Sequence, residues 1–251
     1  MNIVDIIEKN SLVMSIGLVA VMLLLGQKTS RAIGQERMSS ALSIIIALAI
    51  AGIVGVYTEG SRGIANIPLF SGMGILGSSM LRDYAIISTA YGAKWEDIKQ
   101  AGLPGIVALL VGVVLSFALG SLVAFAMGFR DPKDITTIGA GTVTFVVGPV
   151  TATAIGASSL ASTLSVAAGV TKSVVTMIIT PILAPHIGLD NPTSAMVYGG
   201  LIGTTSGVSG GLAATDPKLV PYGALTATFY TGLGTLLCPS VLYLAVLRIL
   251  G

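Results

Sequence analysis

Charged residues along the chain are spaced so that long apolar segments alternate with short polar connections. A helix of about 20 apolar residues is enough to cross a hydrocarbon core of about 30 Å. The pattern therefore predicts an all-α integral membrane protein with about eight membrane elements, some of them broken or re-entrant. These elements are expected at 10–27, 38–58, 63–81, 100–129, 135–189 (two elements), 191–215 and 219–247.

Composition supports the membrane interpretation. The chain has 251 residues, of which 53% are hydrophobic and 10% are charged. A soluble domain carries about 25% charged residues, so a soluble fold of this chain would lack the polar surface to cover itself. We expect a single polytopic membrane domain over 1–251.

Several function classes are excluded by what the sequence lacks. The net charge of +2 is small and scattered, which argues against a nucleic-acid partner. A single cysteine and a single histidine, Cys238 and His186, leave no disulfide or zinc site within the chain. No nucleotide-binding loop or nucleophile motif is present, so we expect neither an enzyme nor an organic cofactor.

Four apolar segments are unusually rich in Gly, Pro, Ser and Thr: 68–83, 136–159, 203–218 and 222–232. At membrane depth, hydroxyls and freed backbone carbonyls can replace the water around a sodium ion, and the positive end of a broken helix suits a carboxylate. Ordinary hydrogen bonding between helices is the alternative explanation for the same composition.

Small residues recur every four positions in three places, which would put them on one helix face and let helices approach closely. For the first set we expect packing alone, and after the second we expect a helix break at Asp216–Pro217. The sets are Gly112, Ser116, Gly120 and Ala124; Gly199, Gly203, Gly207 and Gly211; and Gly148, Ala152 and Gly156.

Two loop carboxylates, Asp83 and Asp216, each follow a Gly- and hydroxyl-rich apolar segment and each have a cation nearby. They could bind an ion at the tip of a re-entrant element, or they could be solvated helix ends with a local salt bridge. Their similar placement is consistent with an inverted repeat of two halves, 1–130 and 131–251.

Lys172 is the one Lys, Arg, Asp or Glu between Asp134 and Asp190. An ammonium at bilayer depth costs about 3 kcal/mol or more, so such a residue usually has a partner or a task. Three interpretations stay open: contact with an anionic substrate, a structural pair with an acid on another helix or subunit, or an interfacial position if a turn falls near 169–173.

Three long runs of the sequence resemble the large (M) subunit of the two-subunit malonate/sodium symporter. They are IPLFSGMGILGSSMLRDYAIISTAYGA (67–93), TTIGAGTVTFVVGPVTATAIGASS (136–159) and AATDPKLVPYGALTATFYTGLG (213–234). The resemblance extends over essentially the whole chain. It implies sodium-coupled malonate uptake across the bacterial cytoplasmic membrane, with Na⁺ as coupling ion and a small membrane subunit (the L subunit) as partner.

For that activity, the residues suggest two groups of ligands. Donors for the malonate carboxylates could be Lys172 and the hydroxyls of Thr151, Thr153, Thr205 and Ser206, with backbone N–H groups at helix breaks. Oxygens for sodium could come from Thr142, Thr144, Asp216, Thr226 and Thr228 with nearby carbonyls.

Two other classes of function remain open on the residues alone. One is a membrane-embedded sodium-translocating subunit of a decarboxylase complex, and the other is a membrane scaffold that transports nothing. The resemblance, and no single residue, favours the symporter over both.

Overall fold

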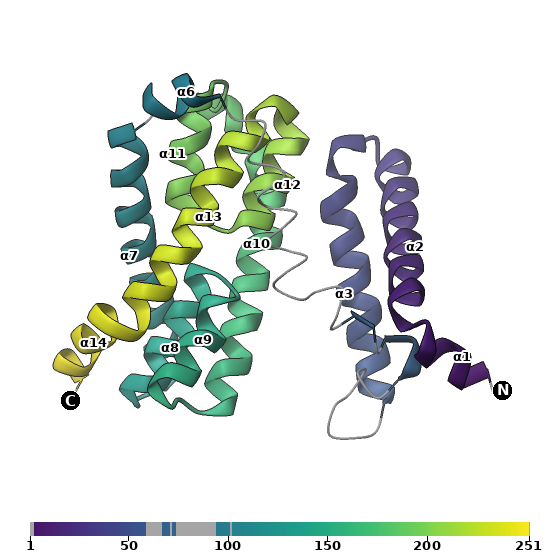
Figure 1. The fold of residues 1–251 in the computed structure, drawn as a ribbon, viewed down its shortest axis with the longest axis horizontal. Coiled ribbons are helices and arrows are strands. Elements are labelled where there is room, and N and C mark those ends of the chain that lie inside the picture. The colour runs from purple at the N-terminus through teal and green to yellow at the C-terminus, as the bar shows by residue number, and fades with distance from the viewer. Residues whose placement is uncertain (1–2, 59–66, 71, 74–93, 101, 251) are drawn as a thin grey trace. The chain divides into compact units, whose positions relative to one another are not determined.

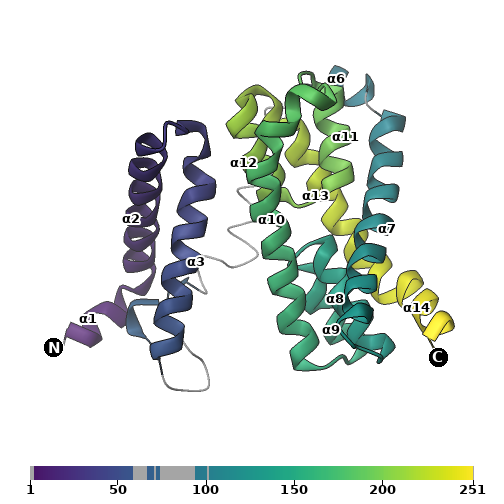
Figure 2. The ribbon, with the colours of Figure 1, turned by 180° about the vertical axis from the view of Figure 1, so that it is seen from behind.

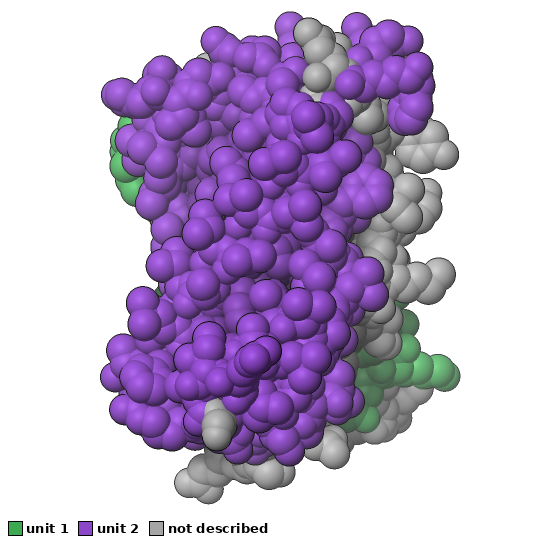
Figure 3. Space-filling view, turned by 90° about the vertical axis from the view of Figure 1, so that its left-hand side faces the viewer, with its two compact units in different colours: residues 1–85 green, residues 86–251 purple. Residues whose placement is uncertain are grey.

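The computed structural model describes residues 3–58, 67–70, 72–73, 94–100 and 102–250, and these ranges contain helices without strands. The chain divides into two compact units, 1–85 and 86–251 (Figure 3). Most of the expected element at 63–81, and Asp83 with it, lie outside the described residues. The single domain and the halves meeting at residue 130 stay predictions.

The first unit is built on two long apolar helices, α2 and α3, which pack against each other (Figure 1). A side chain at Gly26 of α2 would overlap the backbone of Ser43 on α3, so glycine permits this close contact. The elements of the unit are α1 (Ile3–Lys9), α2 (Ser11–Ala32), η1 (Glu36–Met38), α3 (Ser39–Tyr57) and η3 (Pro68–Phe70).

The second unit combines long helices with pairs of short ones. Figures 1 and 2 show α8 and α9 toward one end of the long helix α10, and α11 and α12 toward its other end. The elements are α6 (Trp95–Gln100), α7 (Gly102–Ala126), α8 (Pro132–Val143), α9 (Val147–Ile155), α10 (Ser159–Ile187), α11 (Pro192–Ile202), α12 (Thr205–Thr215), η4 (Pro217–Leu219), α13 (Val220–Leu237), η5 (Cys238–Leu242) and α14 (Tyr243–Leu250).

Among the described residues, five helical stretches are long and apolar enough to cross a membrane: Ser11–Ala32, Ser39–Tyr57, Gly102–Ala126, Ser159–Ile187 and Pro217–Leu250. The segment 135–189 holds one such helix preceded by two short ones, where we expected two spans. The segment 191–215 holds two short helices in place of one element. Broken helices were expected, but they account for more of the chain than the charge pattern indicated.

Helix α7 has the pattern of a helix that faces lipid, with small residues on its buried side and large apolar residues on its outer side. Its buried side holds small residues, among them Gly112 and Gly120, while Leu119 and Leu122 on the outer side are each 64% exposed. Leucines in that position would be costly in water and are at home in a hydrocarbon core. The small-residue face of α7 packs against α8 and α11, as the sequence predicted.

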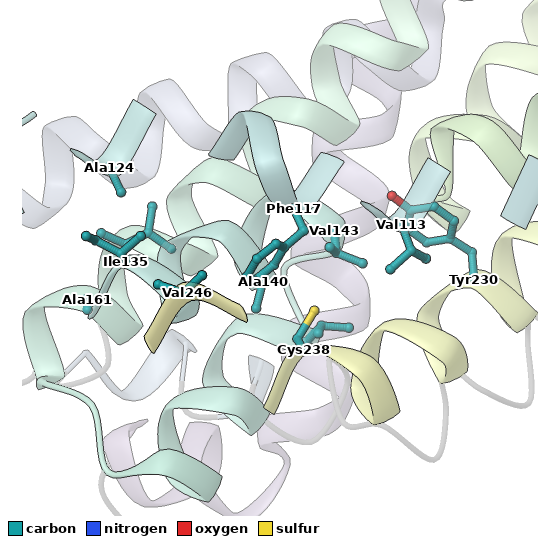
Figure 4. Close-up of a cluster of buried hydrophobic side chains, with 12 residues drawn as sticks. Val113, Phe117, Ala124, Ile135, Ala140, Val143, Ala161, Tyr230, Cys238 and Val246 are labelled. Carbon is teal, nitrogen blue, oxygen red and sulfur yellow. The ribbon is translucent and has the colours of Figure 1, made fainter. Parts of the chain in front are cut away.

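The core of the second unit gathers apolar side chains from helices far apart in the sequence. Figure 4 shows Val113 and Phe117 of α7 in one cluster with Val143 of α8 and Tyr230 of α13. Cys238, which lies in the π-helical turn η5, is buried in the same cluster. Tyr230 is fully buried, and its ring and hydroxyl reach from this core to the helix breaks described below.

Polar side chains fix the ends of the short helices. Asp131 accepts a hydrogen bond from the backbone N–H of Lys133 at 2.8 Å and starts α8. Asp134 accepts from both the backbone N–H and the hydroxyl of Ser158, at 2.8 and 2.9 Å, and so ties the beginning of α8 to the beginning of α10. His186 lies in the last turn of α10, where it is exposed.

Candidate functional site

The first helix break lies between α8 and α9, at residues 144–146. Pro149 stands in the first turn of α9, where its missing N–H costs nothing, but its ring would clash with the carbonyl of Phe145 in a continuous helix. Thr144 accordingly has extended backbone angles, φ −151° and ψ 155°. The carbonyls at the end of α8 are left without partners inside the helix.

The second helix break lies between α11 and α12, at Gly203 and Thr204. Gly203 has φ +76°, a left-handed conformation that glycine adopts without strain and that commonly ends a helix. The set Gly199, Gly203, Gly207 and Gly211 therefore does not form a stripe on one continuous helix, which corrects the prediction. The break predicted at Asp216–Pro217 is confirmed, because α12 ends at Thr215.

The side chain of Lys172 meets the first break. Its ammonium donates to the carbonyl oxygen of Thr142 at 2.8 Å and lies 3.3 Å from that of Val143, both at the end of α8. It also donates to the hydroxyl of Ser116 on α7 at 2.9 Å and lies 3.4 Å from the hydroxyl of Tyr230 on α13. The negative end of a helix dipole favours a cation at this place.

Two of the three interpretations of Lys172 can be compared with this geometry. Lys172 lies near the middle of α10, a helix of 29 residues, so no turn falls at 169–173 and that basis for an interfacial lysine is wrong. Such a helix is about 43 Å long. In the part of the chain that the structure describes, no carboxylate lies within ion-pair distance of Lys172. The positive charge is therefore bound only by neutral oxygens there.

The neighbouring residue on α10, Ser173, reaches the second break. Its hydroxyl is hydrogen-bonded to that of Thr204, and both residues are buried. Gly207, in the first turn of α12, packs against the backbone of Ser173, so α10 and α12 are in close contact. Consecutive residues of one continuous helix thus contact the two broken segments.

Tyr230 connects the same two places from α13. Its hydroxyl donates to the carbonyl oxygen of Gly112 at 3.0 Å and lies next to the Lys172 ammonium. Its ring lies against Gly203, where an added side-chain carbon would overlap it. The Lys172 ammonium lies 5.2 Å from the centre of this ring. Tyr230 and the Lys172 ammonium together therefore link the end of α8 to Gly203 at the second break.

The helix ends at these breaks have opposite polarity. The carboxyl end of α8 presents carbonyl oxygens, which suit a cation. The amino end of α12 presents backbone N–H groups, which suit an anion. Thr204 does not cap these groups with its side chain. Together with Lys172, the breaks offer binding groups for both a carboxylate and a cation.

The four hydroxyls predicted to bind substrate lie in different surroundings. Thr205 and Ser206 are the first two residues of α12, so the structure places them at the second break. Thr151, on α9, is fully buried, and its hydroxyl has no hydrogen-bond partner among the described residues. Thr153 is exposed and donates to the carbonyl of Pro149 at 3.0 Å.

The predicted sodium ligands are also divided. Thr142 and Thr144 lie at the first break, where the carbonyl of Thr142 accepts a hydrogen bond from Lys172. Thr226 and Thr228 lie on α13 and hydrogen-bond to carbonyls of their own helix, at 3.2 Å to Gly223 and 2.8 Å to Ala224. The structure does not bring these two pairs together around one point.

Asp216 lies at the far end of α12 from the break. Its carboxylate accepts from the backbone N–H of Lys218 at 3.0 Å and starts the short helix η4. It lines a pocket of about 500 Å³ with Lys94, Asp190, Pro192, Lys218, Leu219, Pro221 and Tyr222. Because α12 has 11 residues, about 16 Å of helix separate Asp216 from Thr204.

Four residues of the site were not singled out for binding by sequence: Ser116, Ser173, Thr204 and Tyr230. Ser116 did appear in the small-residue stripe of α7, where packing was the expected role. Ser173 and Thr204 could have been found from their position beside other candidates, because Ser173 follows Lys172 and Thr204 precedes Thr205. Tyr230 lies within the hydroxyl-rich segment 222–232, but nothing in that segment distinguishes it from its neighbours.

Comparison with known proteins identifies the family. No curated protein and no solved structure matches the chain. The family model described as the malonate/sodium symporter MadM subunit matches residues 3–250, which is nearly the entire chain. This agrees with the helical structure and with the five apolar membrane-length stretches found among the described residues. The chain is a multi-pass membrane protein and belongs to the family of MadM subunits of malonate/sodium symporters.

Proposed function

We propose that this protein imports malonate together with Na⁺ across the bacterial cytoplasmic membrane, acting with a small membrane subunit, the L subunit. The family supplies the activity, since its members are subunits of a malonate/sodium symporter. The observation that carries the proposal is Lys172, a cation in the middle of an apolar helix, which among the described residues has only neutral oxygens around it. A charge in such a place is explained if it binds an anion during transport.

Malonate is a small dianion, and removing its water is costly unless donors replace it. Lys172 and the amino end of α12 can supply these donors. Thr205 and Ser206 begin α12, so their backbone N–H groups lie at the break where the helix dipole is positive, and their hydroxyls could add further donors. Thr151 and Thr153 are assigned a supporting role on α9, with the buried and unpartnered hydroxyl of Thr151 better placed of the two.

Sodium is the coupling ion and is carried as a substrate. Oxygen atoms at the carboxyl end of α8 suit it, above all the carbonyls of Thr142 and Val143 and the hydroxyl of Thr144. Thr226, Thr228 and Asp216 remain candidates for a separate site nearer the other end of the unit. Cation and anion each lower the cost of bringing the other into a medium of low dielectric constant, which couples their transport.

An inverted repeat would explain the arrangement of the second unit. The long helix α7 is followed by the short pair α8 and α9, and the long helix α10 is followed by the short pair α11 and α12. The pairs lie toward opposite ends of α10 (Figure 1). Repeats of this kind, with broken helices meeting near the membrane midplane, are common in secondary transporters. We infer an elevator-like movement of the helix pairs as the means of transport.

The test is malonate uptake into proteoliposomes that contain this protein and its partner subunit. An inward Na⁺ gradient should drive accumulation of labelled malonate, and an equal gradient of K⁺ or choline should not. Uptake that is indifferent to the Na⁺ gradient would contradict the coupling. Uptake that requires a decarboxylase subunit and a decarboxylation substrate would assign the protein to a sodium-pumping complex.

A further inference from the structure

We infer that the Lys172 ammonium and Na⁺ compete for the same oxygen atoms at the end of α8, so that sodium binding releases Lys172 to meet the substrate carboxylate. This inference rests on the proposed function and describes how its two ions are coupled. Until sodium binds, the lysine acts as a tethered cation at these oxygens.

The atoms around Lys172 are those of a cation site. Two are backbone carbonyl oxygens, those of Thr142 and Val143, which can only accept hydrogen bonds or coordinate a positive ion. The hydroxyl of Tyr230 donates its proton to Gly112, so the oxygen presents a lone pair to the ammonium. With the hydroxyl of Ser116, four oxygens from three helices surround one cation.

Carbonyl and hydroxyl oxygens at the negative end of a broken helix are also the ligands that sodium uses in secondary transporters. A sodium ion bound to the Thr142 carbonyl would lie within a few ångströms of the present position of the ammonium, since the ammonium itself is 2.8 Å from that oxygen. Two positive charges so close in a medium of low dielectric constant repel strongly. The same oxygens therefore hold one cation at a time.

Once released, the Lys172 side chain can turn toward the second break. It is a flexible chain of four carbons, and Tyr230, which it already touches, extends to Gly203 at the second break. A carboxylate bound at the amino end of α12 would lie on that side of the tyrosine. The order of events follows: sodium binds first, Lys172 turns toward the second break, and malonate binds last.

The charges also fit this order. With sodium bound and Lys172 displaced, the site contains two positive charges, which a malonate dianion neutralises. Without sodium, the ammonium stays with the carbonyls of α8, and the anion loses its strongest partner. Malonate alone, or sodium alone, therefore leaves net charge in a region of low dielectric constant.

The experiment is calorimetric titration of Na⁺ into the purified protein with its partner subunit, at constant ionic strength maintained with choline chloride. In Lys172→Met the competitor is absent, so Na⁺ should bind at least about tenfold more tightly than in the wild type when both proteins are titrated without malonate. Lys133→Met is the matched control, because it removes an exposed lysine on the same short helix α8. Its Na⁺ affinity should equal that of the wild type.

Unchanged or weaker Na⁺ binding in a folded Lys172→Met protein overturns the inference. If that variant does not assemble, Lys172→Gln replaces it: its amide N–H can still donate to the carbonyls, but it has no positive charge to repel sodium, so Na⁺ should again bind more tightly than in the wild type. A wild-type measurement needs no variant: malonate should not bind in Na⁺-free choline buffer, and binding of equal affinity with and without Na⁺ overturns the inference. Wild-type uptake driven by Na⁺ is measured on the same preparation, and its absence would refute the proposed function instead.

Discussion

The ammonium of Lys172 lies 2.8 Å from the carbonyl oxygen of Thr142, although 30 positions separate the two residues in the sequence. The contact joins the middle of the continuous helix α10 to the end of the broken helix α8. The carbonyls at the end of α8, which have no partner inside the helix, thereby bind a buried charge. They lower the cost of burying the ammonium, and the ammonium supplies the hydrogen bonds that these carbonyls would otherwise lack.

Replacing Lys172 by Met should abolish sodium-driven malonate uptake. The methionine side chain has about the length of the lysine chain but carries no charge to attract a carboxylate. Assembly should persist, because removing a buried charge also removes its desolvation cost. Uptake into proteoliposomes and size-exclusion chromatography with the partner subunit measure the two effects.

Lys133→Met serves as the control for that experiment, since Lys133 is exposed at the beginning of α8. It should transport malonate at the wild-type rate. Near-normal uptake by a well-assembled Lys172→Met protein would remove Lys172 from the substrate site.

Removing single oxygen atoms from the group that surrounds Lys172 should weaken the binding of sodium without abolishing transport. Tyr230→Phe keeps the ring against Gly203 but loses the hydroxyl that contacts Gly112 and Lys172. Ser116→Ala loses one hydroxyl. One hydrogen bond contributes about 1 kcal/mol, so the Na⁺ concentration for half-maximal uptake should rise about fivefold in each variant.

The matched control for the tyrosine is Tyr243→Phe, which changes the same side chain at the beginning of α14, outside the site. Sodium dependence should stay at the wild-type value there. Equal Na⁺ dependence in Tyr230→Phe and Tyr243→Phe would mean that the Tyr230 hydroxyl serves only the packing of α7 and α13.

Much of the protein's class could be predicted from the sequence, because composition and charge spacing depend on the solvent around a helix and not on its partners. The apolar segments and the hydroxyl-rich breaks follow from that, whereas the sequence left Lys172 open between an interior and an interfacial position. The position of the second break does not follow from composition or charge spacing. Gly203 was one of four evenly spaced glycines, and the features that distinguish it, a positive φ and the ring of Tyr230 packed against it, appear only in the structure.

The oxygen atoms around Lys172 could not be predicted for a related reason. Ser116 and Tyr230 lie 56 and 58 positions from the lysine, and no local pattern links them. Ser116 also has the size that close packing of α7 requires, so its sequence signal is the same whether or not it binds a cation. Residues with two roles of this kind are identified only by their neighbours in three dimensions.

Substitution of Gly203 by Ala should destabilise the protein more than a comparable change elsewhere. The alanine would adopt a left-handed conformation at a cost of about 1–2 kcal/mol, and its methyl group would also overlap the ring of Tyr230. Thermal unfolding in detergent measures the loss, and we expect uptake to fall with it because the second break would shift.

Gly156→Ala separates the two contributions to that loss. Gly156 has φ +67°, close to that of Gly203, but an added side-chain carbon would meet nothing within 4 Å. Gly156→Ala should therefore show only the part of the loss that comes from forcing alanine into a left-handed conformation. Equal melting temperatures for the two variants would show that the Tyr230 ring can move away without cost.

Asp216 provides a test of how far the sodium site extends. About 16 Å of helix lie between it and the second break, and its carboxylate already accepts a hydrogen bond from the backbone of Lys218. Asp216→Asn keeps an oxygen for that bond while removing the charge. We therefore expect the Na⁺ concentration for half-maximal uptake to change less than about twofold, compared with about fivefold for Ser116→Ala. A larger increase in Asp216→Asn than in Ser116→Ala would place the transported sodium at the end of α12 and not at the end of α8.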